Sequence, residues 1–367
     1  MLDTVILEIP IQYRAVIDPT KFNPPARVFE AIIGFLKCTN NPKAADRKKG
    51  IYKPKLTIIK RAKELYLKIE FSAPKLLFGN NLEEIGEGDF EEVVNKLRAT
   101  VQEMGVMLWT RQIEEAKVVG FHPSKNIVLT NGYTASFAIR ELSKIDLSKK
   151  MDIERVGFRN DGEALQFYSN RHSVVFYDKI NDLTKPSKRA IDKDQIGKQK
   201  HLFDSIRREV KHFEVLRFEI RISHRDKLEE ILQKTESEGN PTFKDIFKKD
   251  LCQKILRFYW ESLFGGNIFL FNAYNHPQRI LQMTLMKYPK TKMKTAVMLI
   301  GLYLLCKDDE GVRGFRQIVD NYRKTDWNGL RRYLKRFEDD FYRLPMHGFM
   351  KDIEENLDRF EAFRLTG

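Results

Sequence analysis

The feature that most constrains the fold is a pair of β-forming runs that carry charged residues at alternate positions. The runs span residues 171–179 and 215–222, and both are rich in β-branched and aromatic side chains. Because successive side chains of a strand point to opposite faces, Arg217, Glu219 and Arg221 share one face and apolar residues share the other. We expect a sheet with one apolar face and one charged face. Buried unpaired charge is costly, so the charged face is either open to solvent or built around a metal or a polyanion.

The composition indicates a folded protein that attracts polyanions. The chain has 367 residues, a hydrophobic content of 42% and a formal net charge of +14 at pH 7. This length is sufficient for two domains, and the positive charge makes nucleic acid the leading partner. The three cysteines lack the spacing of a zinc site or a disulfide framework. No apolar run is long enough to cross a bilayer and no leader is evident, so we expect a cytoplasmic protein.

Strand patterns occupy the first part of the chain and helical patterns the second. Strands are predicted at residues 2–9, 65–72, 118–129, 153–158, 164–168, 173–180 and 215–222. After residue 223 all patterns are helical, at residues 227–233, 243–264, 277–286, 292–305, 312–322 and 327–337. This order predicts an α+β domain over residues 1–238 and an all-α accessory or DNA-binding domain over residues 239–367.

Two segments of the chain are strongly basic. The first spans residues 40–63 and includes Lys48 and Lys49, and the second spans residues 183–211 and includes Arg189. Both are candidates for contact with DNA phosphates, although a solvated hairpin is the ordinary alternative for the first.

Two further features leave structural and functional interpretations open. Residues 73–81 end in Gly-Asn-Asn, which is turn chemistry, so Lys75, Asn80 and Asn81 either cap the following helix or contact DNA. His122 interrupts the strand at 118–129. A single histidine there is either a satisfied structural residue or a ligand.

Four segments in a fixed order carry a resemblance to a known family. They are Leu2–Ile9, Ile69–Asn81, Val174–Lys179 and Leu216–Ile222. The second resembles a Ser-Pro-Ala-Lys…Gly-x-Asn segment and the fourth a Val-Arg-Phe-Glu-Ala-Arg-Ile run. Both belong to the filamentous-phage gene II/X family of replication initiators, the DNA nicking-closing proteins of rolling-circle replication. The resemblance implies an antiparallel sheet with flanking helices, like that of the histidine-hydrophobic-histidine (HUH) endonucleases.

The resemblance also implies a site-specific, metal-dependent nuclease that cuts and rejoins single-stranded DNA. Tyr177 matches the family's tyrosine, whose attack on phosphorus gives a 5′-phosphotyrosine that conserves the phosphodiester energy. Lys179 would neutralise the developing charge or protonate the leaving oxygen, and Arg217 and Arg221 would hold neighbouring phosphates. Tyr168 is the rival nucleophile.

The expected metal site departs from the family pattern. Where the family has Arg-Ile-Asp, this chain has Gly120-Phe121-His122, and an imidazole can replace a carboxylate as a ligand. We expect His122, Glu219 and Glu70 to bind Mg²⁺ or Mn²⁺. None of the seven histidines is two residues from another, so the HUH triplet is absent and the site is a carboxylate-rich variant. Alternatively, Glu219 belongs to a cross-strand salt-bridge network with its two arginines.

The partners expected from the resemblance are a single-stranded or supercoiled DNA origin and a host helicase, with no membrane. A relaxase-like or transposase-like role would use the same chemistry. The alternative from a different class is a non-catalytic replication or repressor protein that binds specific DNA and keeps a decayed nuclease site.

Overall fold

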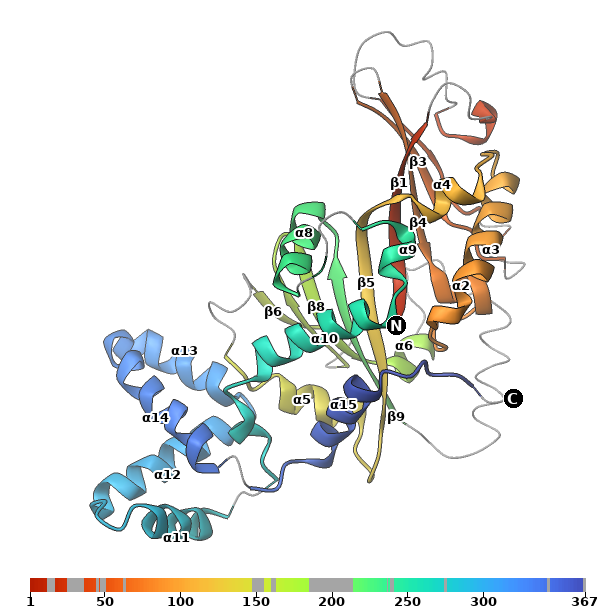
Figure 1. Ribbon diagram of the computed structural model, residues 1–367. Helices are drawn as coiled ribbons and strands as arrows, with labels where there is room; N and C mark the ends of the chain where they lie inside the picture. Colours follow the sequence, from red (N-terminus) through yellow and green to blue (C-terminus); the bar gives the residue numbers. More distant parts are fainter. Residues whose placement is uncertain are drawn as a thin grey trace.

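The fold is built on one large antiparallel sheet. The computed structural model describes residues 1–11, 17–24, 36–43, 46, 51–61, 64–146, 155–159, 163–184, 214–235, 237, 241–273, 276–341 and 344–365. The DNA contacts predicted at Lys48, Lys49 and Arg189 lie outside these ranges. Nine strands form the sheet in the order β2-β3-β4-β1-β5-β9-β8-β7-β6 (Figure 1), and every pair is antiparallel. The predicted α+β class with an antiparallel sheet is confirmed.

The three central strands come from distant parts of the chain. They are β1 (Leu2–Ile11), β5 (Lys117–Leu129) and β9 (Glu214–Ile222). The outer strands are β2 (Leu36–Asn40), β3 (Lys55–Arg61), β4 (Glu64–Ser72), β6 (Arg155–Arg159), β7 (Ala164–Tyr168) and β8 (His172–Asp178). The predicted hairpin between β7 and β8 is present, closed by a hydrogen bond from Ser169 N to His172 O of 3.0 Å.

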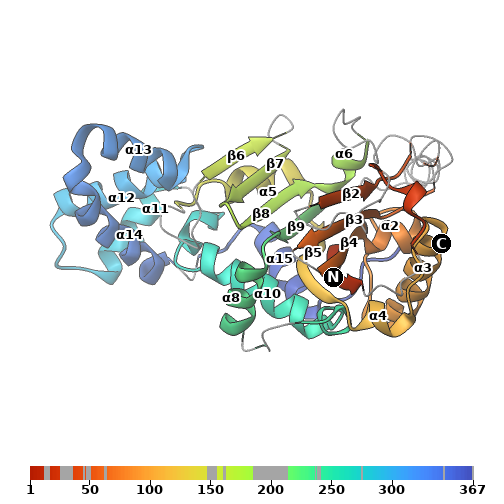
Figure 2. The same ribbon diagram turned by 90° about the horizontal axis from the view of Figure 1, so that it is seen from above.

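The apolar face of the sheet carries the main core. On β9, Leu216, Phe218 and Ile220 are fully buried on this face. Phe218 stacks on Phe176 of β8 with ring centroids 4.6 Å apart, and Trp260 packs edge-on against both rings. Each such side chain contributes about 1.5–3 kcal/mol by leaving water. The helices α5 (Ala135–Leu142), α8 (Arg225–Lys234), α10 (Lys249–Phe264) and α15 (Gly348–Arg359) cover this face (Figures 1 and 2).

A second group of helices packs beside β1 and β4. It comprises α2 (Ala73–Phe78), α3 (Phe90–Glu103), α4 (Thr110–Glu114) and α9 (Phe243–Ile246), with the short helices η1 (Pro19–Lys21) and η3 (Glu87–Asp89). Helix α2 precedes the Gly-Asn-Asn end that was predicted as a turn, and it forms because Pro74 suits the first turn of a helix and Gly79, with φ of 75°, ends it.

The remaining helices form a lobe at one end of the molecule. They are α11 (Pro277–Lys287), α12 (Met293–Lys307), α13 (Gly311–Arg323) and α14 (Trp327–Phe341), with η4 (Ile268–Phe271) and η5 (Lys324–Asp326) (Figure 2). Because α10 and α15 pack on the sheet, the helical part of the chain extends beyond this lobe. The domain boundary at residues 238 and 239 stays a prediction. Within the described ranges, no helix combines the length and apolarity needed to span a membrane.

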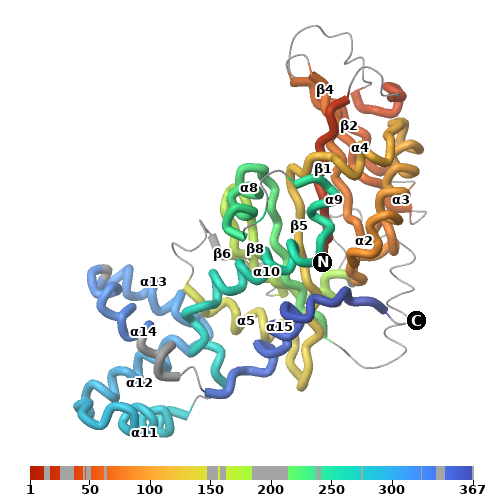
Figure 3. The backbone as a smooth tube through the Cα atoms, viewed as in Figure 1, coloured from red at the N-terminus to blue at the C-terminus, as the bar shows by residue number. Residues whose placement is uncertain are grey.

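The helix predicted over residues 243–264 is two helices in the structure. The hydroxyl of Thr242 accepts from Asp245 N at 3.3 Å and caps α9, and α10 begins at Lys249. After α15 the chain runs back across the molecule toward α2, as the tube in Figure 3 shows. In this last segment Glu361 O and Phe363 N form hydrogen bonds with Lys125 of β5 and with Glu84.

Candidate active site

The register of three strands gathers the charged side chains on the face opposite the core. Ser124 of β5 lies opposite Glu219 of β9, and Tyr177 of β8 lies opposite Arg217. His122 shares the face of Ser124 because the two residues are two positions apart on β5. The strand alternation therefore brings the predicted nucleophile and two predicted ligand or phosphate-binding positions together.

Glu219 is the centre of this group. Its carboxylate is almost completely buried, at 2% exposure. The phenol of Tyr177 donates to Oε2 at 3.0 Å, and Arg221 Nε donates to Oε1 at 2.8 Å. His122 Nδ1 lies 3.5 Å from Oε1. Burial alone would raise the pKa of Glu219, but the neighbouring cations and the hydrogen bond from the imidazole hold it well below its ordinary value. Glu219 is therefore an ionised acceptor.

Arg217 lies beneath this group and is fully satisfied by protein atoms at both terminal nitrogens. Nη1 donates to Asn81 O at 2.9 Å, and Nη2 donates to Ser124 Oγ at 2.8 Å. Nη2 also lies 3.5 Å from Asp3 Oδ1. The side chain is only 1% exposed. The phosphate contact predicted for Arg217 does not fit this burial, and its guanidinium instead supports the site from below.

Asp3 reaches the charged face because β1 is irregular there. The register of β1 against β5 shifts between Leu2 and Val5, as in a β-bulge, so that one strand carries an extra residue. Asp3 Oδ1 accepts a hydrogen bond from Ser72 Oγ at 3.0 Å. Without this irregularity the alternation would direct Asp3 into the apolar core.

Tyr177 and Lys179 form the second half of the group. Burial raises the pKa of the Tyr177 phenol well above its ordinary value. Lys179 is 0% exposed, and its Nζ lies 5.6 Å from the centre of the Tyr177 ring. Among the described residues this Nζ has no hydrogen-bond partner. Burial, followed by the nearby Arg217 charge, lowers the pKa of Lys179 well below its ordinary value.

The backbone places Lys179 at this point by ending the strand early. The strand was predicted to run to residue 180, but β8 ends at Asp178 and α6 (Lys179–Thr184) begins. Asp178 Oδ1 accepts from Asn181 N at 2.9 Å, which caps the first turn of α6. Lys179 therefore lies in the first turn of α6, where its Nζ packs against the Tyr177 ring, instead of extending along the sheet face beyond Tyr177.

A cavity of about 380 Å³, which we call the site pocket, lies over part of this group, and Arg217 and Lys179 are not among the residues that line it. It is bounded by Asp3, Thr4, Asn81, His122, Ala164, Gln166, Val175, Tyr177, Asp182, Glu219 and Arg221. The side chain of Arg221 is 37% exposed, so it is accessible to a bound anion, as predicted for phosphate. The pocket thus presents a phenol, an imidazole, carboxylates and one accessible guanidinium to the outside.

No family model, curated protein or solved structure matches this chain. The interpretation of the site therefore depends on its own chemistry.

Glu70 is not brought to the predicted metal pair. It lies on β4, which β1 separates from β5, and its carboxylate is 3.7 Å from Lys55 Nζ on β3. It is not among the residues that line the site pocket. Within the part of the chain that the structure describes, no three acidic, histidine or cysteine side chains cluster closely enough to hold a metal. His122 and Glu219 are the two predicted ligands that the fold places together.

The three residues near position 80 that were predicted to contact DNA lie in different environments in the structure. Asn80 is buried, and its Oδ1 accepts from the backbone N–H groups of Leu82 and Glu83 at 3.0 Å each, so it holds a turn. Asn81 lines the site pocket, and its buried Oδ1 has no hydrogen-bond partner among the described residues. Lys75 is half-buried on α2, and its DNA contact stays a prediction.

The rival tyrosine lies elsewhere. Tyr168 pairs with Ser173, whereas Tyr177 pairs with Ala164, so the two phenols sit at opposite ends of the β7–β8 hairpin. Sequence reasoning missed Asp3, Ser124 and Asp182. Ser124 had a usable signal, because it alternates with His122 on the same strand.

A second buried ion cluster lies near the site pocket and involves the end of the chain. Glu84 Oε2 is 2.6 Å from Lys125 Nζ, and the same carboxylate accepts from the backbone N–H groups of Asn126 and Phe363 at 2.5 and 2.9 Å. Lys125 also donates to Glu361 O at 2.8 Å. Burial would raise the pKa of Glu84, but nearby ammonium groups outweigh it and hold the pKa at about 2.

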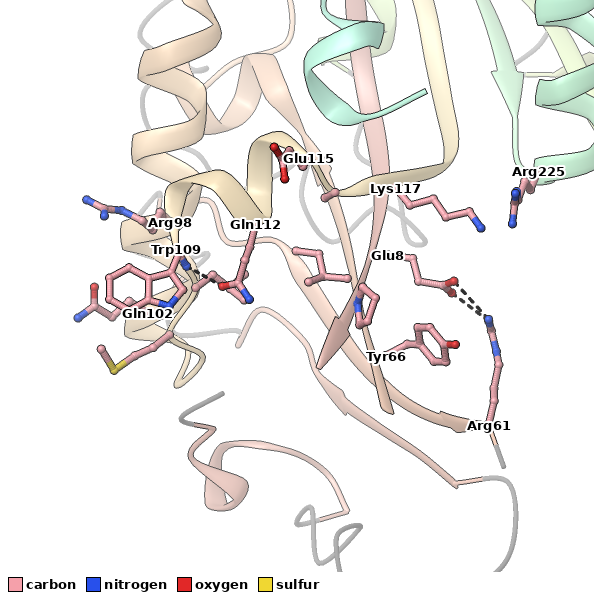
Figure 4. A pocket seen from close by; sticks show the side chains of 15 residues that line it. Glu8, Arg61, Tyr66, Arg98, Gln102, Trp109, Gln112, Glu115, Lys117 and Arg225 are labelled. Carbon is pink, nitrogen blue, oxygen red and sulfur yellow. Dashed lines mark hydrogen bonds and ion pairs between the residues drawn. The ribbon is translucent and has the colours of Figure 1, made fainter. Parts of the chain in front are cut away.

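A groove of about 1020 Å³ lies at the other end of β1 (Figure 4). The indole of Trp109 stands at its rim and is 77% exposed. Cationic side chains of Arg98 and Lys117 also line it, and Arg61 pairs with Glu8 at 3.0 Å. The groove therefore combines an exposed aromatic surface with positive charge.

Proposed function

We propose that this chain is a metal-dependent endonuclease and strand transferase that nicks single-stranded DNA and rejoins it. The observation that carries the proposal is the hydrogen bond from the Tyr177 phenol to buried Glu219, inside a pocket that also presents His122 and Arg221. A tyrosine that lines a pocket, is held by an ionised carboxylate and lies beside cations is suited to attack on a phosphodiester.

In the first step Tyr177 Oη attacks phosphorus in line. The new bond joins Oη to phosphorus, and the bond from phosphorus to the 3′-oxygen breaks, which leaves a 5′-phosphotyrosine and a free 3′-hydroxyl. Glu219 keeps its charge and orients Oη through the hydrogen bond of 3.0 Å, and the phenolic proton passes to solvent water as the bond to phosphorus forms. Rejoining is the reverse step, in which a 3′-hydroxyl attacks the phosphotyrosine and Tyr177 recovers its proton. No external energy source is needed.

Lys179 would act through its charge beside the Tyr177 ring, 5.6 Å from the ring centre, because it is 0% exposed and does not line the site pocket. The leaving 3′-oxygen then takes its proton from solvent water. Arg221 is accessible at the pocket and neutralises charge on the phosphoryl oxygens. Arg217 is a positioning residue, because its hydrogen bonds to Asn81 and Ser124 fix the floor of the site.

The donors in the pocket fit a hard divalent cation. To hold the ion, His122 Nδ1 and Glu219 Oε1 would give up their mutual contact of 3.5 Å, and Asn81 would add an amide oxygen that has no partner among the described residues. Mg²⁺ usually keeps several waters and binds through few protein ligands together with substrate phosphates, so this small set is compatible with Mg²⁺ or Mn²⁺. When bound, the ion would withdraw charge from the scissile phosphate.

The groove supplies a place for the strand that flanks the cut. Thr4 of β1 lines the site pocket, and Glu8 of the same strand lines the groove, roughly 13 Å further along the strand. Trp109 offers a stacking surface for bases, and Arg98 and Lys117 offer charge for phosphates. A single strand following β1 would connect the two cavities.

The biological role follows from the chemistry and from the resemblance to the gene II/X initiators. We infer an HUH-like endonuclease that initiates rolling-circle replication of a phage, plasmid or mobile element at a DNA origin. The net charge of +14 supports a nucleic-acid substrate. A host helicase and a cytoplasmic location belong to the same proposal.

The test is the variant Tyr177→Phe, with Tyr168→Phe as its matched control. Cleavage of labelled single-stranded DNA should fall by about 10³-fold or more in Tyr177→Phe, while DNA binding and the Tyr168→Phe variant keep wild-type values. Equal cleavage by Tyr177→Phe and wild type would remove the proposed nucleophile. A wild-type protein that binds cognate DNA and never cleaves it would favour the binding-only alternative.

A further inference from the structure

The helix α12 carries apolar side chains on its outer as well as its inner surface. Its inner residues, among them Leu299, Tyr303 and Cys306, are buried in the helical lobe. Val297 and Leu305 point outward and are 56% and 53% exposed. A helix that is apolar all round is normally buried on all sides, so the outer face of α12 is suited to a partner.

The outer face is symmetric about Gly301, which stands near the middle of α12 (Met293–Lys307). Val297 and Leu305 lie one helical turn to either side of Gly301, and exposed Lys294 and Asp308 lie two turns to either side. A Cβ built at Gly301 would meet no atom within 4 Å, so the backbone is open to close approach by another helix.

We propose that α12 is a homodimer interface in which the same helix of a second copy packs antiparallel to it, with the two-fold axis at Gly301. In this arrangement Val297 faces the partner's Leu305, and Lys294 faces the partner's Asp308. Each contact occurs twice, as a two-fold axis requires.

The charges flanking α12 support an antiparallel second copy as the occupant. Exposed lysines precede and begin the helix, at Lys287, Lys290, Lys292 and Lys294. Exposed acids follow it, at Asp308, Asp309 and Glu310. A two-fold axis at Gly301 sets the basic end of each copy against the acidic end of the other, whereas a parallel pairing would oppose like charges.

The shape of the surface beside α12 also supports the antiparallel homodimer. A shallow hollow of about 540 Å³ is lined by Gly301, Leu304, Leu305, Lys307 and Asp308. The two-fold axis directs the partner's Met298 toward this hollow, and Met298 is itself 45% exposed and flexible enough to fill it. The lobe lies at one end of the molecule, so the site pockets of both copies stay open (Figure 2).

The experiment is analytical ultracentrifugation of the full chain over a concentration series, at an ionic strength near 0.15 M where the Debye length is about 8 Å and net repulsion is screened. Wild type should show a monomer–dimer equilibrium. Val297→Glu should raise the dissociation constant at least tenfold. Ile318→Glu, at a similarly exposed apolar residue of α13, should leave it unchanged. Circular dichroism checks that each variant is folded.

Charge reversal tests the orientation. Lys294→Glu and Asp308→Lys should each weaken self-association, because each sets like charges against each other. An equimolar mixture of the two variants should associate, because both cross-copy pairs then become attractive. A wild-type protein that stays monomeric at all concentrations, a Val297→Glu dimer of wild-type strength, or a mixture that fails to associate would overturn the proposal.

Discussion

Two buried carboxylates of this protein have similar surroundings and different uses. Glu219 and Glu84 are each 2% exposed, and each has a pKa below its ordinary value because cations outweigh the effect of burial. Around Glu84 the partners are a lysine and backbone N–H groups, which no substrate can replace. Around Glu219 they are a phenol, an imidazole and an accessible arginine that open on a pocket.

The two lysines beside these carboxylates differ in the same way. Lys125 is paired with Glu84 and a backbone carbonyl, whereas buried Lys179 has no hydrogen-bond partner in the described part of the chain. A buried charge without a partner destabilises the fold and is retained at functional sites. A buried carboxylate with a lowered pKa therefore does not by itself indicate a functional site. A buried charged group that lacks a hydrogen-bond partner and lies beside a pocket does.

The largest expected difference is in activity. Glu219→Gln keeps the size of the side chain but removes the charged acceptor that orients Tyr177, so cleavage should fall by about 10²–10⁴-fold. Glu84→Gln should cleave at the wild-type rate per folded molecule. Single-turnover cleavage of labelled DNA measures the rate of each variant. Equal loss of cleavage in the two variants would show that the Glu84 cluster is as important for activity as the Glu219 cluster.

The next effect is on stability. Breaking the buried pair with Glu84→Ala should lower the free energy of unfolding by about 3–5 kcal/mol. The stabilisation by Glu84 is complete above its ordinary pKa of 4.5 and is lost as the pH falls toward about 2, which is a change of about 3 kcal/mol. Urea unfolding at several pH values should show this acid dependence in wild type and a smaller one in the variant.

Substitution of the two lysines should change the free energy of unfolding in opposite directions. Lys179→Met removes a buried ammonium and should raise the free energy of unfolding by about 1–4 kcal/mol while it lowers cleavage. The folded-state pKa of Lys179 is lowered, so the penalty is complete below that pKa, decreases as the pH rises, and vanishes above the ordinary pKa near 10.5. Lys125→Met should destabilise, because it leaves Glu84 unpaired. Destabilisation by both substitutions would show that Lys179 has a structural partner.

A smaller effect, on DNA affinity alone, should distinguish DNA binding in the groove from DNA cleavage in the site pocket. Trp109→Ala removes the stacking surface of the groove and should weaken binding of single-stranded DNA by about 1–3 kcal/mol, with the cleavage rate of bound DNA unchanged. Fluorescence anisotropy with a labelled oligonucleotide measures the affinity, and Met107→Ala, at the same rim, is the control. Wild-type affinity of Trp109→Ala would exclude the groove from the DNA path.

The smallest effect is expected for Glu70, the predicted metal ligand that the fold does not bring to His122 and Glu219. Glu70 forms a half-exposed pair with Lys55, and such pairs contribute about 0–1 kcal/mol. Glu70→Gln should therefore change stability by no more than this and leave the Mn²⁺ concentration dependence of cleavage as in wild type. A clear shift of that dependence would return Glu70 to the metal site.

The sequence was sufficient wherever strand alternation alone decides the outcome. Residues 217, 219 and 221 share a face because the period of a strand is two, and Tyr177 joins them because β8 and β9 pair in register. The order of strands in the sheet cannot be read in this way. Glu70 has the correct alternation on β4, but β1 lies between β4 and β5 and keeps it from His122.

Local irregularities explain most of the remaining differences. Asp3 reaches the site only through the irregular pairing of β1, and Lys179 packs in the first turn of α6 because Asp178 ends β8 and caps that helix. Both depend on tertiary context that outweighs the local pattern. Contacts such as that of Phe363 with Glu84 join distant parts of the chain and leave no periodic signal.

The most direct test of the central claim is to trap and map a covalent intermediate. The purified protein is incubated with a pool of labelled single-stranded DNA, with and without Mn²⁺, and any protein–DNA adduct is separated by denaturing electrophoresis and mapped by mass spectrometry. We expect a Mn²⁺-dependent adduct on Tyr177. An adduct on Tyr168 or another residue, or stable binding of cognate DNA without an adduct, would contradict the account.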